Sequence, residues 1–463
     1  DEICFLTATE LAGLIRRRDV SAREVMEAHL RRIEAVNPGV NAIVTLVAEK
    51  ALDAADAADA AVARGEALGP LHGLPIAVKD AHRTRGIRTT QGSPIHADDV
   101  PDTDELIVER EKQAGAIVLG KTNLPEFGAG SQTFNPVFGP TLNPYDLSRT
   151  CGGSSGGSAV ALACGMAPLA DGSDMGGSLR NPASFCNVVG LRPSPGRVPS
   201  WPAQLAWSTL SVDGPMARTT ADVALLLSAI AGPDPRSPIA LGEPGSRFAA
   251  PLDRSFQGTR IAWVHLGLPF EAEVRAVVDA QRPVFEGLGC TVEDEEPDLA
   301  DADEIFKGIR AWLFEAARGD DYRARRPLKA TIVWNVEQGL GLTGPDLGRL
   351  ETMRTALYER IRLFMTRYDY LVLPVSQVLP FDIDTEFPTQ VDGVAMDSYI
   401  DWMRSCYLIS ATGNPAISVP AGFSADGLPV GLQIVGRYND DWSVLQLAHA
   451  FEGATEHGKR RPA

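Results

Sequence analysis

The chain has 463 residues, of which 44% are hydrophobic and 22% are charged, which is the composition of an ordinary globular protein and excludes extensive disorder. The formal net charge of −17 argues against nucleic acid and anionic membrane surfaces as partners, because both are negatively charged. Since no apolar stretch is long enough to span a membrane and the first residues lack the basic start of a signal peptide, we expect a cytoplasmic protein.

The first part of the chain is predicted to begin with helices and then to alternate strands with helices. Two Ser/Thr-x-x-Glu capping boxes predict a pair of helices within 7–36, and the Ala/Asp-rich segment 48–65 predicts a third. A short apolar strand is expected at 74–80, followed by a helix at 103–114 and a second apolar strand at 116–121.

The next part continues this alternation. A Gly/Ser run at 152–158 leads into a helix of small residues, and strands are predicted at 167–174 and 188–194 before a helix at 219–232. Alternating strands and helices favour an α/β fold, which we expect to have a mixed, mostly parallel central sheet covered by helices on both faces.

The composition changes after a Pro/Gly/Ser-rich connection that begins near residue 233. Most of 270–367 is predicted to be helical, including a long helix at 345–368, and a last helix is expected at 440–453. Strands return at 370–375, 416–422 and 427–436. We therefore expect a single domain over 1–463, built from N-terminal helices (1–65), a core (66–235), a mainly helical insertion (236–368) and C-terminal core strands with a helix (369–463).

Two patterns that suggest ligand sites have a plainer interpretation. GAIVLGKT at 115–122 matches the phosphate-loop pattern, but its four central residues are typical of a buried strand, so nucleotide binding is not expected. The six cysteines include no Cys-x-x-Cys pair, so we expect reduced, mostly buried thiols and neither disulfides nor a zinc site. They are Cys4, Cys151, Cys164, Cys186, Cys290 and Cys406.

DMGGSLR at 174–180 is a candidate nucleophile loop. Because Ser178 follows two glycines, its Oγ can be presented with little steric crowding. The backbone N–H groups of this stretch can form an oxyanion hole, contributed by Met175, Gly176, Gly177 and Ser178. A helix start capped by a serine is the structural alternative. A second run, GGSSGGSA at 152–159, suits an anion cradle or an unusual backbone shape, but Gly and Ser alone also fit a linker.

A serine nucleophile needs a base, and none of the seven histidines lies near either Gly/Ser run in the sequence. The nucleophile elbow G-x-S-x-G is also missing from 171–184. Lys79, at the end of an apolar strand, is the candidate base, because burial lowers the pKa of an ammonium group and a neutral amine accepts protons near pH 7. The alternative is a lysine that reaches solvent or pairs with Asp80.

Taken together, these motifs resemble the amidase signature family over most of the chain. They occur in the family's order as GLPIAVKD (73–80), LGKTNLPEF (119–127), FGPTLNPYD (138–146), GGSSGGSA (152–159), DMGGSLRNPA (174–183), VVGLRPSPGRV (188–198), GPMART (214–219), GNPAISVPAGF (413–423) and GLPVGLQIVGR (427–437). The resemblance implies the amidase signature fold and hydrolysis of a small-molecule amide without a metal or organic cofactor. Homodimers are common among relatives, and a homodimer is one assembly to expect.

The resemblance also implies roles for individual residues. Ser178 resembles the family's nucleophile, Lys79 its base, and Ser154 the middle serine, which follows Gly153 through a cis peptide bond. The oxyanion-hole stretch matches at residues 175–178, where Met175 is a mild departure that backbone donors tolerate. Supporting roles are expected for Gly153, Ser155, Asp174 and Arg180, the last two holding the shape of the loop.

The substrate is the least defined part of the prediction. Gly130, Ser131 and Trp207 are expected to contact it, although Trp207, like Trp201, is also consistent with a core position. Trp402 and Tyr407 suggest core more than pocket wall. The main expectation is hydrolysis of a small carboxamide to an acid and ammonia or an amine. The alternatives are the glutaminase (A) subunit of a tRNA-dependent amidotransferase, ester hydrolysis, and a catalytically silent binding protein.

Overall fold

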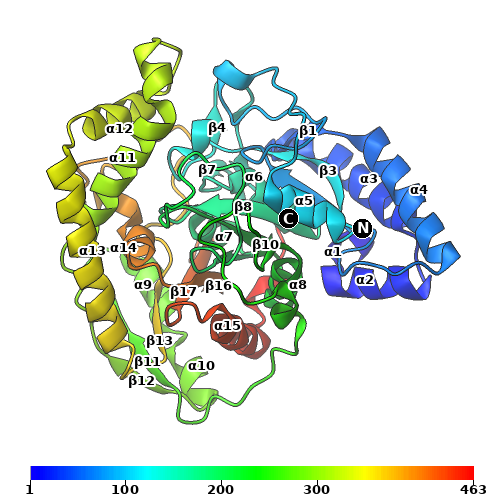
Figure 1. The fold of residues 1–463 in the computed structure, drawn as a ribbon. Coiled ribbons are helices and arrows are strands. Elements are labelled where there is room, and N and C mark those ends of the chain that lie inside the picture. The colour runs from blue at the N-terminus through cyan, green and yellow to red at the C-terminus, as the bar shows by residue number, and fades with distance from the viewer. Residues whose placement is uncertain (1) are drawn as a thin grey trace.

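One large mixed sheet forms the centre of the computed structural model, which describes residues 2–463 (Figure 1). Within these residues the sheet has eleven strands. In sheet order they are β1 (Ile43–Leu46), β3 (Ile117–Thr122), β2 (Pro75–Lys79), β8 (Leu169–Asp174), β10 (Val212–Ala217), β9 (Val189–Arg192), β16 (Ala416–Phe423), β17 (Pro429–Val435), β13 (Tyr370–Pro374), β11 (Arg260–Trp263) and β12 (Thr291–Asp294). Three small ribbons pair β4 (Phe134–Asn135) with β5 (Gly139–Pro140), β6 (Leu142–Asn143) with β7 (Asp146–Thr150), and β14 (Gln390–Val391) with β15 (Val394–Ala395).

The expected α/β fold with a mixed sheet is confirmed, but parallel pairing is less frequent than predicted. In residues 2–463, four of the ten strand pairs of the sheet are parallel: β3–β2, β2–β8, β13–β11 and β11–β12. The connection 424–428 between β16 and β17 is too short for anything but an antiparallel turn. Residues 193–211, between β9 and β10, contain no helix that could form a parallel crossover, and these strands also pair antiparallel.

The helices form largely where the sequence predicts them. Both capping boxes are present: Glu10 accepts from the Thr7 N–H at 2.8 Å, and Glu24 accepts from the Ser21 N–H at 2.8 Å. The helices are α1 (Glu2–Phe5), α2 (Ala8–Arg17), α3 (Ala22–Val40), α4 (Ala48–Arg64), α5 (Leu106–Gln113), α6 (Gly156–Ala163), α7 (Arg180–Phe185), α8 (Thr220–Ile230), α9 (Ala272–Asp279), α10 (Arg282–Gly287), α11 (Ala302–Arg323), α12 (Ala330–Leu340), α13 (Gly344–Phe364), α14 (Arg404–Thr412) and α15 (Asp441–Thr455). The short α7 was expected only as the structural alternative for 174–180; a helix does begin there, but its N-cap is Leu179 and no side chain caps it.

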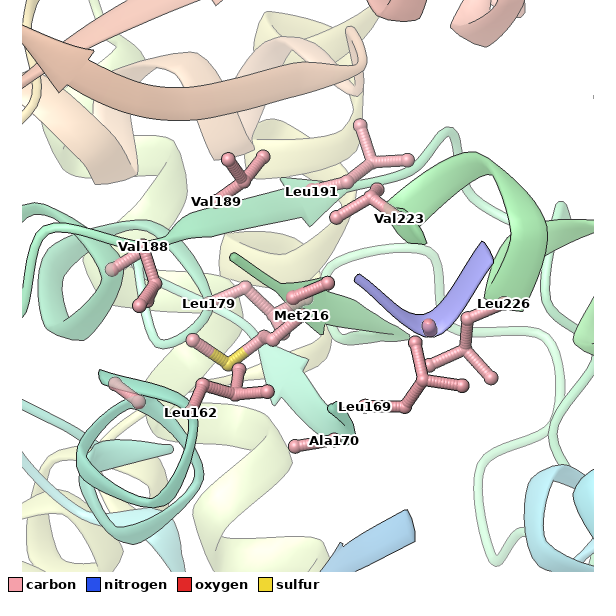
Figure 2. Close-up of a cluster of buried hydrophobic side chains, with 14 of the residues drawn as sticks. Leu162, Leu169, Ala170, Leu179, Val188, Val189, Leu191, Met216, Val223 and Leu226 are labelled. Atoms are coloured by element: carbon pink, nitrogen blue, oxygen red, sulfur yellow. The ribbon is translucent and has the colours of Figure 1, made fainter. Parts of the chain in front are cut away.

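Helices cover both faces of the sheet, and strand β9 shows how. A Cβ on Gly190 would lie 2.2 Å from the Leu179 carbonyl oxygen and 3.0 Å from Ala183, so this side of β9 faces α7 and the residue before it. The next residue, Leu191, points to the opposite face, where it lies beside Val223 of α8 (Figure 2). The close approach of α7 therefore requires a glycine in β9, and the core continues on the far side.

The segment 236–368, expected to be a mainly helical insertion, also contributes two strands to the sheet. β11 and β12 pair in parallel beside β13, while α11, α12 and α13 lie at the end of the molecule opposite α2, α3 and α4 (Figure 1). The last six residues of GAIVLGKT form the fully buried strand β3, as predicted, and not a phosphate loop. All six cysteines are buried and free, as expected. None of the helices within residues 2–463 is long and apolar enough to cross a bilayer.

Candidate active site

Lys79 is the last residue of β2, and its side chain is fully buried. Strand β2 lies in parallel beside β8, and the Lys79 N–H donates to Asp171 Oδ1 at 2.6 Å. The Lys79 Nζ is 2.7 Å from Ser154 Oγ, 3.0 Å from Ser155 Oγ and 3.0 Å from Ser173 Oγ. The structure thus joins the lysine to both expected serines of the first Gly/Ser run and to Ser173, which no motif in the sequence indicated.

The surroundings of Lys79 favour a neutral amine. Burial lowers its pKa to about 7, although the negative charges of Asp171, Asp213 and Asp174 act in the opposite direction. The expected alternative, a pair with Asp80, is wrong: the Asp80 carboxylate accepts from the Thr90 N–H at 3.0 Å and from the Thr90 hydroxyl at 2.5 Å. A neutral amine has two hydrogens and one lone pair, so one of its three hydroxyl neighbours donates to nitrogen.

A buried charge cluster lies behind Lys79. His82 Nδ1 is 3.0 Å from Asp171 Oδ2, and His82 Nε2 is 3.3 Å from Asp213 Oδ1. Burial lowers the pKa of His82, but the two carboxylates outweigh this effect and hold it well above its ordinary value. One local signal could have placed Ser173 beside Asp171: these residues stand two apart in strand β8, and residues so spaced share a face of the sheet.

The first Gly/Ser run is neither a linker nor a free loop. The Gly153–Ser154 peptide bond is cis, and the run leads directly into α6, whose residues are all buried. Residues 151–158 are buried as well. The Ser155 N–H donates to the Ser178 carbonyl oxygen at 3.2 Å, so a direct hydrogen bond ties the two Gly/Ser runs together.

The second run forms a tight loop between β8 and α7. Gly177 has φ 120°, and a Cβ there would lie 2.6 Å from Cys406 Cβ, so only glycine fits. The Gly177 N–H donates to Asp174 Oδ1 at 2.9 Å, and this donor is therefore not free for an oxyanion, contrary to the expectation that all four N–H groups serve. In the described part of the chain, no hydrogen bond uses the N–H of Met175, Gly176 or Ser178.

Asp174 and Arg180, for which the sequence predicts supporting roles, lie in one buried ion network. The Asp174 carboxylate accepts from Arg180 Nη2 at 2.9 Å, from Arg192 Nη1 at 3.1 Å and from the Leu179 N–H at 3.1 Å. Burial raises the pKa of Asp174, but the two guanidinium groups outweigh it and hold that pKa well below its ordinary value. All three charged side chains are fully buried, so this network belongs to the core of the site and not to the surface.

A cavity of about 90 Å³ lies at the junction of these loops. Its lining includes Ser154, Ser173 and Ser178 together with Met175 and Gly176, and the remaining lining residues are Phe127, Gly128, Gly130, Ser131, Ser211, Phe306, Arg310, Phe314 and Met403. Phe127 ends the motif LGKTNLPEF, whereas Phe306, Arg310 and Phe314 come from a segment that no motif indicates.

Only two of the three residues expected to contact substrate lie at the cavity. Gly130 and Ser131 line the cavity. Trp207 does not, and its side chain is 77% exposed, so it belongs to neither the cavity nor the core. Trp402 and Tyr407 are buried core residues, as predicted.

Comparison with known proteins places this geometry in a family. The Amidase family model matches residues 24–445. An acylamidase from Rhodococcus erythropolis is 36% identical over 99% of this chain and 97% of its own length. The glutamyl-tRNA(Gln) amidotransferase (A) subunit from Moorella thermoacetica is 39% identical over 100% of this chain and 99% of its own. The structure of a bacterial aryl acylamidase of the amidase signature family superposes with a TM-score of 0.92, at 28% identity and over 100% of both chains. The chain therefore belongs to the amidase signature family of enzymes, hydrolases that act on carbon–nitrogen bonds.

Proposed function

We propose that the protein hydrolyses a small carboxamide to an acid and ammonia or an amine through a seryl acyl-enzyme. One observation carries the proposal. The Lys79 Nζ lies 2.7 Å from Ser154 Oγ, and Ser154 shares the lining of a single small cavity with Ser178. A base, a hydroxyl relay and a nucleophile thus meet at one site, with no histidine among the residues that line it.

The proton moves through two hydroxyls. Neutral Lys79 accepts the proton of Ser154 Oγ, and Ser154 takes the proton of Ser178 Oγ as that oxygen attacks the amide carbonyl. The pKa of about 7 matches this role, because a base works best when its pKa is close to the working pH. The relay then returns a proton to the leaving nitrogen, and water hydrolyses the ester of Ser178.

The carbonyl oxygen becomes negatively charged when Ser178 attacks. The N–H groups of Met175, Gly176 and Ser178 supply the donors for this oxyanion, while the Gly177 N–H keeps the Asp174 carboxylate in place. One such donor contributes roughly 3–4 kcal/mol to transition-state stabilisation. Backbone donors do not depend on the side chain at position 175.

The test is a panel of aliphatic, aryl, α-amino-acid, ureido and malonamic amides, scored by released ammonia or amine. We expect Ser178→Ala to lower kcat on every active substrate by about a thousandfold or more, because the acyl-enzyme cannot form. Ser148, an exposed residue whose hydroxyl donates to Asp146 Oδ1, is the matched control, and Ser148→Ala should keep wild-type kcat. A Ser178→Ala enzyme with near-normal kcat contradicts the nucleophile assignment.

The glutaminase component of a tRNA-dependent amidotransferase is the second candidate, because the Moorella relative is 39% identical over the whole chain. That relative is named as one part of a larger complex, so the two functions differ in what the chain does by itself. Turnover of simple amides by the purified chain supports the stand-alone amidase. Glutaminase activity that appears only with co-purified partner proteins supports the second candidate.

A further inference from the structure

Helix α11 presents one cation to the catalytic cavity. Phe306, Arg310 and Phe314 follow one another at intervals of four residues, which places them on one face of the helix. All three line the cavity that contains Ser178. Of the residues that line this cavity within 2–463, Arg310 alone has a charged side chain.

The Arg310 guanidinium is held entirely by uncharged groups. Nη1 donates to Asn335 Oδ1 and Nη2 donates to Tyr399 Oη. The guanidinium carbon lies 4.5 Å from the centre of the Phe314 ring and 5.3 Å from that of Tyr399. Arg310 is only 5% exposed, so solvent does little to balance its charge.

The nearby carboxylates are already paired with other cations. Asp303 lies 3.0 Å from Lys307, and Glu304 lies 2.6 Å from Arg349. Asp401 lies 2.7 Å from Lys307. Over residues 2–463, no carboxylate comes within the 4.0 Å of Arg310 that would make an ion pair, even though these acidic residues stand on or beside the same helix.

A buried charge without a counter-ion is costly, and such a charge persists where a ligand completes it. The planar guanidinium matches the two oxygens of a carboxylate. We propose that the substrate of this site carries a carboxylate, which binds Arg310 while the amide carbonyl faces Ser178. This inference rests on the proposed amide hydrolysis and specifies its substrate class.

Two features of the cavities limit which carboxylate-bearing substrates can bind. The catalytic cavity of about 90 Å³ is small beside the roughly 300–1,000 Å³ of sites for drug-sized ligands, so only a short spacer fits between carboxylate and amide. A second cavity of about 430 Å³ also borders Arg310, but its lining holds more carboxylates than cations and so favours an anion less. That lining includes the carboxylates Asp303, Glu304, Asp397 and Asp401 against two further cations, Lys307 and Arg349. The carboxylate therefore binds on the catalytic side.

The first test compares matched substrates in the wild-type enzyme, so it does not depend on a variant that folds. Succinamate carries a carboxylate on the acyl side, where isocaproamide has an uncharged isopropyl group. N-acetyl-β-alanine and N-isopentylacetamide differ in the same way on the amine side. We expect the anionic member of one pair to have a kcat/KM about tenfold higher or more, and the pair that responds identifies the side that carries the charge.

The second test removes the cation. Arg310→Met should abolish the preference for the anion, with a smaller effect on the neutral amide, and Arg310→Lys should keep part of it. Arg349→Met is the control, because Arg349 lies outside the catalytic cavity and already has a carboxylate partner. The Arg349→Met enzyme should prefer the anionic substrate as strongly as wild type does.

Two results overturn the carboxylate site while amide hydrolysis stands: equal kcat/KM within both substrate pairs, or a preference for the anion that survives in Arg310→Met. If no amide is turned over, the proposed function fails, and the carboxylate site is then tested by the thermal stability of the protein with succinate. A rise in Tm with succinate that is lost in Arg310→Met supports the site. A rise that persists in Arg310→Met overturns it.

Discussion

At the scale of single residues, the proposed catalysis depends on how the charge of Lys79 is balanced. Burial removes the solvation of the ammonium group, while three carboxylates restore part of its stability, and the pKa of about 7 is the outcome. The proposed mechanism uses the neutral amine. The rate should therefore be lost as pH falls below about 7 and should reach its plateau above it.

Removal of one of these carboxylates should shift that pH dependence in a known direction. In Asp213→Asn a negative charge that favours the ammonium is gone, so the pKa of Lys79 falls and the acidic limb of kcat/KM moves to lower pH, by about half a pH unit. The substitution is nearly isosteric, so it removes the charge while the amide oxygen can still accept a hydrogen bond from one of the two partners of Asp213, His82 and Ser200.

The comparison needs a carboxylate that does not act on the site. Asp98 is exposed and is not among the charges that shift the pKa of Lys79, so Asp98→Asn should leave the acidic limb in place. The measurement is kcat/KM against pH for wild type and both variants. An acidic limb that stays fixed in Asp213→Asn, or that moves to higher pH, means that Lys79 is not the titrating base.

At the scale of elements, the loop between β8 and α7 is held by the buried pair of Asp174 with Arg180 and Arg192. Because the pKa of Asp174 is depressed, its contribution to stability is complete above the ordinary value of 3.8 and is lost as pH falls through the folded-state pKa. Asp174→Asn leaves two buried guanidinium groups without an anion at neutral pH. We expect the free energy of unfolding to fall by about 3–5 kcal/mol.

Denaturant unfolding at pH 7 checks this prediction. Asp19 pairs with Arg17 at the surface, where its side chain is 53% exposed, and Asp19→Asn should leave the unfolding midpoint unchanged. A midpoint of Asp174→Asn equal to that of wild type would show that the network does not stabilise the fold. Each variant removes one carboxylate, but Asp174 is buried between two arginines whereas Asp19 pairs with one arginine at the surface.

Local signals predicted the elements well where the signal was long or capped. The boxes at Thr7 and Ser21 and the apolar run of β3 are complete within a few residues, and these elements appear where expected. Strand direction was predicted less well, because it depends on connections whose paths are not encoded locally. Strand β10 was missed because Gly214 and Pro215 interrupt its apolar pattern.

At the scale of the whole molecule, the sheet brings together residues that are far apart in the chain. Lys79 lies at the end of β2, whereas Ser154 and Ser178 stand just before α6 and α7. Their motifs made them predictable as members of a family. His82 and Asp213, which meet across 131 positions, carried no motif, and neither did Arg310, because such contacts exist only once the chain is folded.

The most direct test of the proposed catalytic relay is covalent labelling by a small fluorophosphonate, with its rate and position measured between about pH 5 and pH 9, on either side of the Lys79 pKa. We predict that the label maps to Ser178 and that its rate rises with pH through about 7. A label on any other residue, or a rate that does not change over this range, would contradict activation of Ser178 by a neutral Lys79.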